Sequence, residues 1–165
     1  MTLPIVAMGL NRPLPIEVTA ITQPFWDGLS QGSFLVVRCR SCERLSFPPR
    51  QICPKCHHRE FDWLPMSGRC TLYSATKIHN SPSIYGILSP MQVGIVDLVE
   101  GVRIVTRLLP KGSSYQLDKP LQLVITKHPD GYHYAARSAA EVYRVDSGHI
   151  LGPCRRGQLR QCARR

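Results

Sequence analysis

The sequence predicts a mainly β protein: a short N-terminal helix and a rubredoxin-like zinc ribbon, then a five-stranded OB-fold barrel and a basic tail. Three observations predict it: two Cys-x-x-Cys pairs, several strand-like apolar segments joined by Gly- and Pro-containing turns, and an Arg-rich end. The chain of 165 residues is 43% hydrophobic, which suits one globular domain or two small ones. We expect an arm and helix in residues 1–33, the ribbon in 34–64, the barrel in 65–140 and a flexible basic tail in 141–165.

The two Cys pairs, Cys39–Cys42 and Cys53–Cys56, are separated by ten residues, a spacing typical of a zinc ribbon. Each pair fits a tight turn, and two facing turns offer four thiolates in a tetrahedron, which suits Zn²⁺. Four sulfur ligands leave no position for water or substrate, so we expect a structural ion rather than a catalytic one. A pair of disulfides is the alternative, but the total of seven Cys is odd and we recognise no secretory signal. These observations favour a reducing compartment, and we expect a cytoplasmic protein.

The residues from Thr22 to Gly32 are predicted to form the helix. Thr22 is a suitable N-cap, Pro24 is tolerated in the first turn, and Gly32 can end the helix. Phe25 and Trp26 fall on one side of it, where they either pack on the zinc ribbon or anchor a partner protein. Both are therefore candidate contacts for a partner or an acyl channel.

Strand-like segments account for most of what remains. In the ribbon we expect three strands, at Phe34–Cys39, Leu45–Phe47 and Glu60–Leu64. Glu100 and Gly101 are expected to form a two-residue hairpin turn between the second and third barrel strands. Five strands without a long helix fit a small OB-type barrel that binds ligands on its strand faces and loops, while an SH3-like barrel or a small sandwich stays open. The five barrel strands are expected at Cys70–Ile78, Gln92–Val99, Val102–Leu109, Leu121–Lys127 and Tyr132–Ser138.

The two ends of the chain differ in character. Residues 1–21 are rich in Pro and show no clear period, which predicts an extended arm lying along a partner or along the protein's own surface. The formal net charge is +10, and six Arg lie in the last 22 residues. Such a tail is usually a solvated segment that binds polyanions weakly, so the total charge does not decide the function. No segment approaches the ~20 apolar residues that a membrane span needs.

Several motifs occur in a fixed order along residues 23–127. They are Pro24-Phe25-Trp26-Asp27-Gly28-Leu29 with Gly32, the four ribbon Cys, Phe47-Pro48-Pro49-Arg50, Gly68-Arg69 before Leu72-Tyr73-Ser74, and the hairpin at 93–103. In this order they resemble the zinc-ribbon plus OB-fold proteins first catalogued as domain of unknown function 35. Proteins of that family accompany thiolase-like enzymes and other acyl-CoA enzymes as accessory subunits.

The resemblance implies a partner-dependent role. Such subunits dock on a thiolase-fold or lipid-transfer-type protein, form a hetero-oligomer with it, and help hold an acyl-CoA substrate. Some of these complexes form or cleave carbon–carbon bonds next to a thioester, with the nucleophilic Cys and the acid–base His on the partner. We therefore expect a non-catalytic subunit whose ligands are structural Zn²⁺ and acyl-CoA.

A CoA ester needs cations for its phosphates and an apolar channel for its acyl and pantetheine parts. Arg103 and Arg107 share one face of a predicted strand, and Lys77 lies on a strand expected beside it, so the three form a candidate anion-binding strip. An ordinary solvated face is the alternative. The long connection between the first two barrel strands adds three candidates for the acyl channel or a partner contact, namely Ile84, Tyr85 and Leu88.

Three other functions stay open. Cys70 could act as a nucleophile, but its place in a strand pattern predicts a buried thiol. A single-stranded nucleic-acid-binding module would need aromatic stacking platforms, for which Tyr73, Tyr132 and Tyr134 are the candidates, and we rank it below the acyl-CoA role. A scaffold that never touches substrate predicts that removing the candidate anion-binding cations leaves the activity of the complex unchanged.

Overall fold

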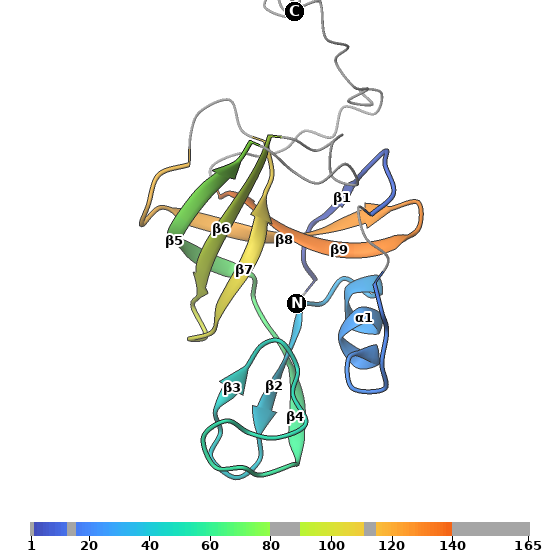
Figure 1. Ribbon diagram of the computed structural model, residues 1–165, viewed down its shortest axis with the longest axis vertical. Coiled ribbons are helices and arrows are strands. Elements are labelled where there is room, and N and C mark those ends of the chain that lie inside the picture. The colour runs from blue at the N-terminus through green and yellow to red at the C-terminus, as the bar shows by residue number, and fades with distance from the viewer. Residues whose placement is uncertain (1, 13–15, 80–89, 111–114, 140–165) are drawn as a thin grey trace, which may run out of the picture.

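The computed structural model describes residues 2–12, 16–79, 90–110 and 115–139, and within them it contains one helix and nine strands (Figure 1). The predicted mainly β architecture is confirmed. No helix in these ranges is long and apolar enough to cross a membrane. The elements are β1 (Ile5–Ala7), α1 (Gln23–Ser30), β2 (Leu35–Cys39), β3 (Leu45–Ser46), β4 (Phe61–Pro65), β5 (Arg69–Ile78), β6 (Met91–Leu98), β7 (Arg103–Leu108), β8 (Pro120–His128) and β9 (Gly131–Ser138).

Five strands close into a barrel, in which β5, β6, β7, β9 and β8 follow one another and β8 pairs again with β5. All neighbouring pairs are antiparallel except β7 and β9, which run parallel. Closure satisfies backbone groups that an open sheet would leave unpaired at its edges. All five predicted barrel strands are confirmed, with each end within one residue of its expected place.

The hairpin between β6 and β7 differs from the predicted two-residue turn. The N–H of Leu98 donates to the carbonyl of Val102, and the N–H of Gly101 donates to the carbonyl of Leu98. Val99, Glu100 and Gly101 therefore form a three-residue loop, and Gly101 has a φ of 86°. This is the common loop in which a turn is followed by a glycine in the left-handed region. The prediction failed because Val99, which looks like a strand residue, belongs to the loop.

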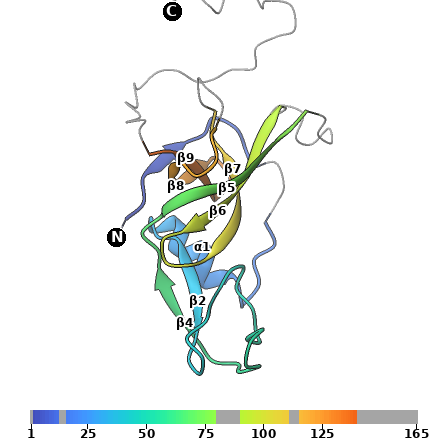
Figure 2. The same cartoon turned by 90° about the vertical axis from the view of Figure 1, so that its left-hand side faces the viewer.

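The zinc ribbon is a three-stranded sheet in which β2 lies between β3 and β4, with antiparallel pairing on both sides. Its three predicted strands are confirmed. The ribbon lies at one end of the barrel, as two perpendicular views show (Figures 1 and 2). Because β3 pairs through only two residues, the ribbon sheet is small and buries little apolar surface of its own.

The helix α1 begins and ends almost where the sequence predicts, but Thr22 does not cap it with its side chain. The backbone of Thr22 is already helical, and its hydroxyl instead accepts the N–H of Thr19 at 3.0 Å. At the other end Gly32 has a φ of 84° and donates its N–H to the carbonyl of Leu29. Together with the bond from the Ser33 N–H to the helix, this arrangement ends α1 in the way expected of a C-terminal glycine.

The N-terminal arm lies on the protein's own surface, which resolves the choice that the sequence left open. Its strand β1 pairs in parallel with β8. Before β1, the side chain of Leu3 is buried in the main core, and after it the carbonyl of Leu10 lies 2.8 Å from the Nδ1 atom of His128. Further along the arm, Arg12 forms an ion pair with Asp130 in the turn between β8 and β9. The arm therefore covers the part of β8 that β5 does not reach.

One hydrophobic core joins the helix, the ribbon and the barrel. Phe25 of α1 lies 5.3 Å, between ring centroids, from Phe34, which precedes β2. The ring of Tyr134 in β9 lies 6.0 Å from that of Phe25. Aromatic rings at these separations add to the free energy of burial. The three parts therefore pack as one unit, and the surface between them has a defined shape.

Hydrogen bonds also fix the segment between ribbon and barrel. The N–H of Ser67 donates to the carboxylate of Glu100 at 2.7 Å, and the N–H of Leu123 donates to the carbonyl of Gly68 at 2.8 Å. Gly68 has a φ of 75°, a conformation that favours glycine. These contacts hold the ribbon at a set orientation to the barrel.

Candidate functional site: a cysteine centre and an aromatic cleft

The Sγ atoms of Cys39, Cys42, Cys53 and Cys56 all lie within 4.8 Å of one another. Two of the separations, Cys39 to Cys56 and Cys42 to Cys53, are 3.5 Å. A tetrahedral zinc ion with sulfur at 2.3 Å requires sulfurs about 3.8 Å apart, so the four thiols fit Zn²⁺. The predicted ligand set is thus brought together as a four-sulfur centre, which supports a structural ion.

The two Cys-x-x-Cys turns have the same backbone conformation. In each, the first Cys donates its N–H to the carbonyl five residues later and accepts the N–H of the residue four later, at 2.9 or 3.0 Å. The residue after the second Cys adopts a positive φ in both, 56° at Glu43 and 59° at His57. Two equivalent turns present their thiols to a common point, as a zinc ribbon requires.

Backbone N–H groups favour the thiolate form of the second pair. The N–H groups of Cys56 and Lys55 point to the sulfur of Cys53 and lower its pKa to about 6. The N–H of His58 lowers the pKa of Cys56 in the same way. A thiolate is the form of Cys that binds a metal, so these N–H groups favour the form of Cys53 and Cys56 that a metal site requires.

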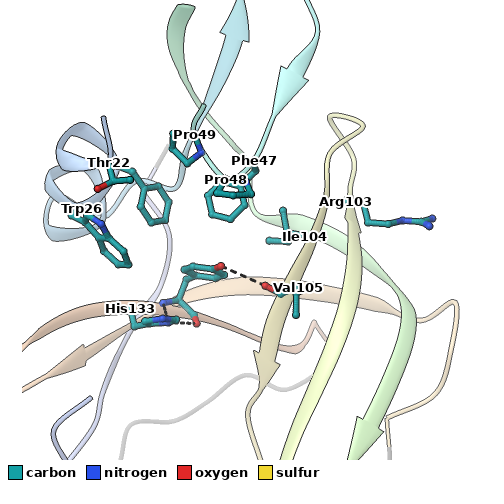
Figure 3. Close-up of a pocket in the computed structure, with 11 residues that line it drawn as sticks. Thr22, Trp26, Phe47, Pro48, Pro49, Arg103, Ile104, Val105 and His133 are labelled. Carbon is teal, nitrogen blue, oxygen red and sulfur yellow. Dashed lines mark hydrogen bonds between the residues drawn. The ribbon is translucent and has the colours of Figure 1, made fainter. Parts of the chain in front are cut away.

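A cleft of about 390 Å³ lies where the helix, the ribbon and the barrel meet. Figure 3 shows side chains of all three parts around it, with Trp26 and His133 on one side and Phe47 on the other. Its lining residues are Thr22, Phe25, Trp26, Phe47, Pro48, Pro49, Arg103, Ile104, Val105, His133 and Tyr134. A concave site with this lining suits an apolar ligand or side chain.

The polar groups of the cleft are few. The Nδ1 atom of His133 accepts the N–H of Tyr134 at 2.8 Å, and burial lowers the pKa of His133, so its imidazole is neutral at pH 7. The indole Nε1 of Trp26 is buried and has no hydrogen-bond partner among the described residues. None of the residues that line the cleft, all of which are described, is a carboxylate or a Cys. The ionisable side chains of the cleft are thus those of Arg103, His133 and Tyr134.

Two of the predicted acyl-channel or partner residues, Phe25 and Trp26, line this cleft. The other three, Ile84, Tyr85 and Leu88, lie outside the described residues. Sequence reasoning missed most of the lining, including His133 and the Phe47-Pro48-Pro49 segment. The segment could be recognised as a motif, but only the packing of ribbon on barrel brings it opposite β9.

Arg103 is not a free cation. Its Nε and Nη2 atoms donate to the two carboxylate oxygens of Asp97 at 2.6 and 2.8 Å, and its guanidinium lies 3.5 Å from the ring centroid of Tyr73. The carboxylate of Asp97 raises the pKa of Arg103 further. Figure 3 shows the side chain directed away from the cleft. Arg103 therefore neutralises Asp97 at the rim of the cleft.

Lys77 does not form a strip with the two arginines. The strand β6 lies between β5 and β7, and a β-bulge at Tyr73 shifts the alternation of β5. Lys77 pairs with Gln92, which pairs in turn with the buried Leu108. Because neighbours along a strand point to opposite faces, Lys77 and Arg107 lie on opposite faces of the sheet. The expectation that Lys77, Arg103 and Arg107 form one anion-binding strip is therefore wrong.

Arg107 lies on the outer face of β7, where it pairs with Val93 on one side and Ala135 on the other. No carboxylate of a described residue forms an ion pair with its guanidinium, and burial lowers its pKa. A partly buried, unpaired guanidinium favours a nearby anion. Of the three predicted cations, Arg107 has the surroundings that best suit an anion-binding group.

Cys70 and the three candidate tyrosines also have defined places. The thiol of Cys70 is buried, as predicted, and burial raises its pKa to about 12. Tyr73 is exposed on β5, whereas Tyr132 and Tyr134 pack against the main core. The three rings are therefore not arranged as one stacking platform for bases.

Comparisons with known proteins agree with this architecture. Residues 26–62 match the family model described as the ChsH2 rubredoxin-like zinc ribbon domain, and residues 63–126 match that of the ChsH2 C-terminal OB-fold domain. The two matches join without a gap and together cover more than half of the chain.

Two curated relatives are similar over about half of this chain. A DUF35 domain-containing scaffold protein of Methanocaldococcus jannaschii is 35% identical over 86 residues, which are 51% of this chain and 61% of the relative. The benzoylsuccinyl-CoA thiolase subunit BbsA of Thauera aromatica is 34% identical over 88 residues, 53% of this chain and 60% of the relative. The matches thus span only about 60% of the length of these relatives.

A solved structure titled Ltp2-ChsH2(DUF35) aldolase is similar in fold. The likeness has a TM-score of 0.67 at 24% identity and covers 76% of this chain and 99% of that one. At this identity it shows the fold alone.

Proposed function

Because the chain belongs to the DUF35 family, whose members join a ChsH2-type zinc ribbon to an OB-fold, we propose that it is a non-catalytic subunit of an acyl-CoA enzyme. In this proposal it docks on a thiolase-fold or lipid-transfer-type partner and helps hold the acyl-CoA ester. The partner performs the carbon–carbon bond formation or cleavage. The aromatic cleft between helix, ribbon and barrel is the observation that carries the proposal.

The chemistry of the described residues supports a non-catalytic role. Four of the five Cys in the described ranges belong to the metal centre, and the fifth, Cys70, is a buried thiol of raised pKa. The imidazole of His133 lies in the cleft without a nucleophile or carboxylate among the described lining residues. A nucleophile and its base would have to come from the partner.

The cleft and Arg107 together have the two properties that an acyl-CoA ester requires. The cleft offers aromatic and proline side chains to the apolar part of the ligand. Arg107 lies on the same strand as Val105, two residues beyond the cleft, which is about 7 Å along the strand. A guanidinium that forms no ion pair within the described part of the chain is, at this distance, a candidate partner for a negatively charged group of CoA.

Affinity purification of the full chain from its native host, followed by mass spectrometry, tests the docking step. Recovery of a thiolase-fold or lipid-transfer-type protein in constant ratio to this chain is the expected result. Recovery of RNA or DNA in place of a protein would contradict the proposal and favour the nucleic-acid alternative. A steep loss of that binding with salt would identify the interaction as electrostatic.

Titration of acetyl-CoA into the recovered complex tests the ligand step. Arg107→Ala is expected to weaken binding by about tenfold or more, since a charge-assisted hydrogen bond contributes roughly 1.5–3 kcal/mol. Arg103→Ala is the matched control from the same strand and face, and we expect less than a twofold effect because Arg103 already pairs with Asp97. No loss of affinity for Arg107→Ala would favour a scaffold that does not touch the substrate.

A further inference from the structure

One wall of the aromatic cleft belongs to the metal-binding loop. Phe47, Pro48 and Pro49 line the cleft, and they lie between Cys42 and Cys53, which supply ligands from the two turns. The segment that carries this wall is therefore fixed to the cysteine centre at both of its ends. Few other contacts of regular structure secure it, because β3 contributes only two residues to the ribbon sheet.

Phe47 connects this loop to the other parts of the molecule. Its ring centroid lies 5.3 Å from that of Phe25 in α1 and 5.1 Å from that of Phe34 before β2. It lies 5.9 Å from the ring of Tyr134 in β9. Displacement of Phe47 would therefore remove packing from the helix side and the barrel side of the cleft at once.

The barrel does not depend on the metal in the same way. Its five strands form a closed ring of ladders, and its inner face holds buried side chains such as Leu72, Val96 and Leu123. Loss of the ion should thus affect the ribbon loop and the cleft before it affects the barrel. Local unfolding costs the least free energy in the regions with the fewest buried contacts.

We propose that the four-cysteine centre controls the shape of the aromatic cleft: metal binding holds the Phe47-Pro48-Pro49 wall in place, and loss of the metal dismantles the cleft while the barrel persists. By thermodynamic linkage, any group bound in the cleft then raises the metal affinity by the same factor as the metal raises affinity for that group. This inference deepens the proposed function by giving a means of regulating its site. It uses only zinc and this chain, so its tests do not depend on the partner or on CoA.

Hydrogen exchange of the full chain, with zinc bound and after chelation with EDTA, is the direct test. Peptides covering residues 43–52 and α1 are expected to exchange at least tenfold faster without zinc, while peptides of β8 keep their protection. Unchanged exchange in α1 would show that the cleft is independent of the metal. Equal loss of protection in β8 would show general unfolding in place of a local change, and either result would overturn the proposal.

Zinc affinity of variants, measured by competition with a chromogenic chelator, tests the coupling from the other direction. Phe47→Ala removes the connecting ring and is expected to weaken zinc binding by about tenfold, within the usual range for coupled sites. Ile52→Ala is the matched control, because Ile52 lies in the same loop next to a ligand but is 43% exposed. We expect less than a twofold change for it.

Phe47→Leu is a control for a general folding defect, because it keeps an apolar side chain at the cleft wall. It is expected to retain most of the zinc affinity. Wild-type zinc affinity in Phe47→Ala, or the same loss of zinc affinity in Phe47→Ala and Ile52→Ala, would contradict a role of the cleft wall in metal binding.

Discussion

Phe34 at the start of the zinc ribbon and Tyr134 in the last barrel strand meet edge to face, with ring centroids 5.0 Å apart and ring planes at 76°. Phe34 is fully buried at 0% exposure. We expect Phe34→Ala to lower the free energy of unfolding by about 3–5 kcal/mol through lost burial and a residual cavity. Urea denaturation followed by circular dichroism measures this. Val99→Ala in the exposed hairpin loop is the control, expected to change stability by less than about 0.5 kcal/mol, and an equal loss there would contradict the packing argument.

Metal content provides a second prediction. The wild-type chain is expected to hold one zinc ion, and Cys53→Ser to lose it, because three thiolates and a hydroxyl no longer supply the preferred donor set. Cys70→Ala is the control, since this thiol lies in the barrel core outside the four-sulfur centre. Elemental analysis after gel filtration measures both. Zinc bound equally by Cys53→Ser and the wild type would refute the ligand assignment.

Substitution of two glycines with positive φ, Gly101 and Gly68, can distinguish the cost of backbone strain from the cost of overpacking. A Cβ atom at Gly101 would meet nothing within 4 Å, so Gly101→Ala is expected to cost only about 1 kcal/mol of conformational strain. A Cβ atom at Gly68 would come within 2.5 Å of Leu3 and 2.7 Å of Gln122. Gly68→Ala should therefore lower the free energy of unfolding by about 1–3 kcal/mol more than Gly101→Ala does, which is the usual cost of overpacking. Thermal or urea unfolding of the two variants, compared side by side, checks the difference, and equal losses would be inconsistent with it.

The thiol of Cys70 gives a prediction about reactivity and pH. Burial and, to a smaller extent, the negative charge of Glu100 raise the pKa of Cys70 to about 12. A thiol of that pKa is ionised in roughly one molecule in ten thousand at pH 8, so iodoacetamide should label it slowly in the native protein and quickly after denaturation. Because the folded-state pKa lies above the ordinary thiol value of about 8.5, the fold favours the neutral thiol, and this stabilisation is lost as pH rises above that value. Mass spectrometry of labelled peptides measures it, and rapid native labelling at pH 8 would contradict a buried thiol.

The Arg12–Asp130 pair predicts how pH affects the N-terminal arm. The backbone N–H and the side chain of Arg12 both donate to the Asp130 carboxylate, and they lower its pKa. A lowered carboxyl pKa stabilises the docked arm fully above the ordinary value of about 3.9, and this stabilisation is lost as pH falls through the lower folded-state value. Asp130→Asn should remove it at neutral pH, so hydrogen exchange in residues 5–12 is expected to rise. Asp97→Asn, which removes another paired carboxylate, should leave the arm unaffected.

The parts of the fold that the sequence predicted well depend on local spacing. The four ribbon Cys and the alternation of strands such as β7 are set by residues close together in the chain, so both were predictable. The bulge at Tyr73 was not, because a single extra residue leaves the apolar pattern almost intact while it changes the face to which Lys77 points. The turn at Val99 was missed for a similar reason, since a β-branched residue looks like part of a strand.

The cleft could not be predicted in the same way, because its walls come from three separate segments. Trp26, Phe47 and His133 are far apart in the chain and meet only when the helix and ribbon pack on the barrel. Their positions on the predicted helix made Phe25 and Trp26 candidate contacts, but no periodicity relates residues as far apart in the chain as Trp26, Phe47 and His133. The pairing of Arg103 with Asp97 also required the register of β6 and β7.

The arm along β8 has a practical consequence for anyone who shortens this protein to the region matched by the two family models. A version that starts at residue 26 would lack β1, and the backbone groups of Ile125 and Lys127 that face it would be open to neighbouring molecules. The space filled by Leu3 would also be vacated. Unpaired strand edges of this kind pair with strands of other molecules, so we expect the shortened version to self-associate more strongly than the full-length chain.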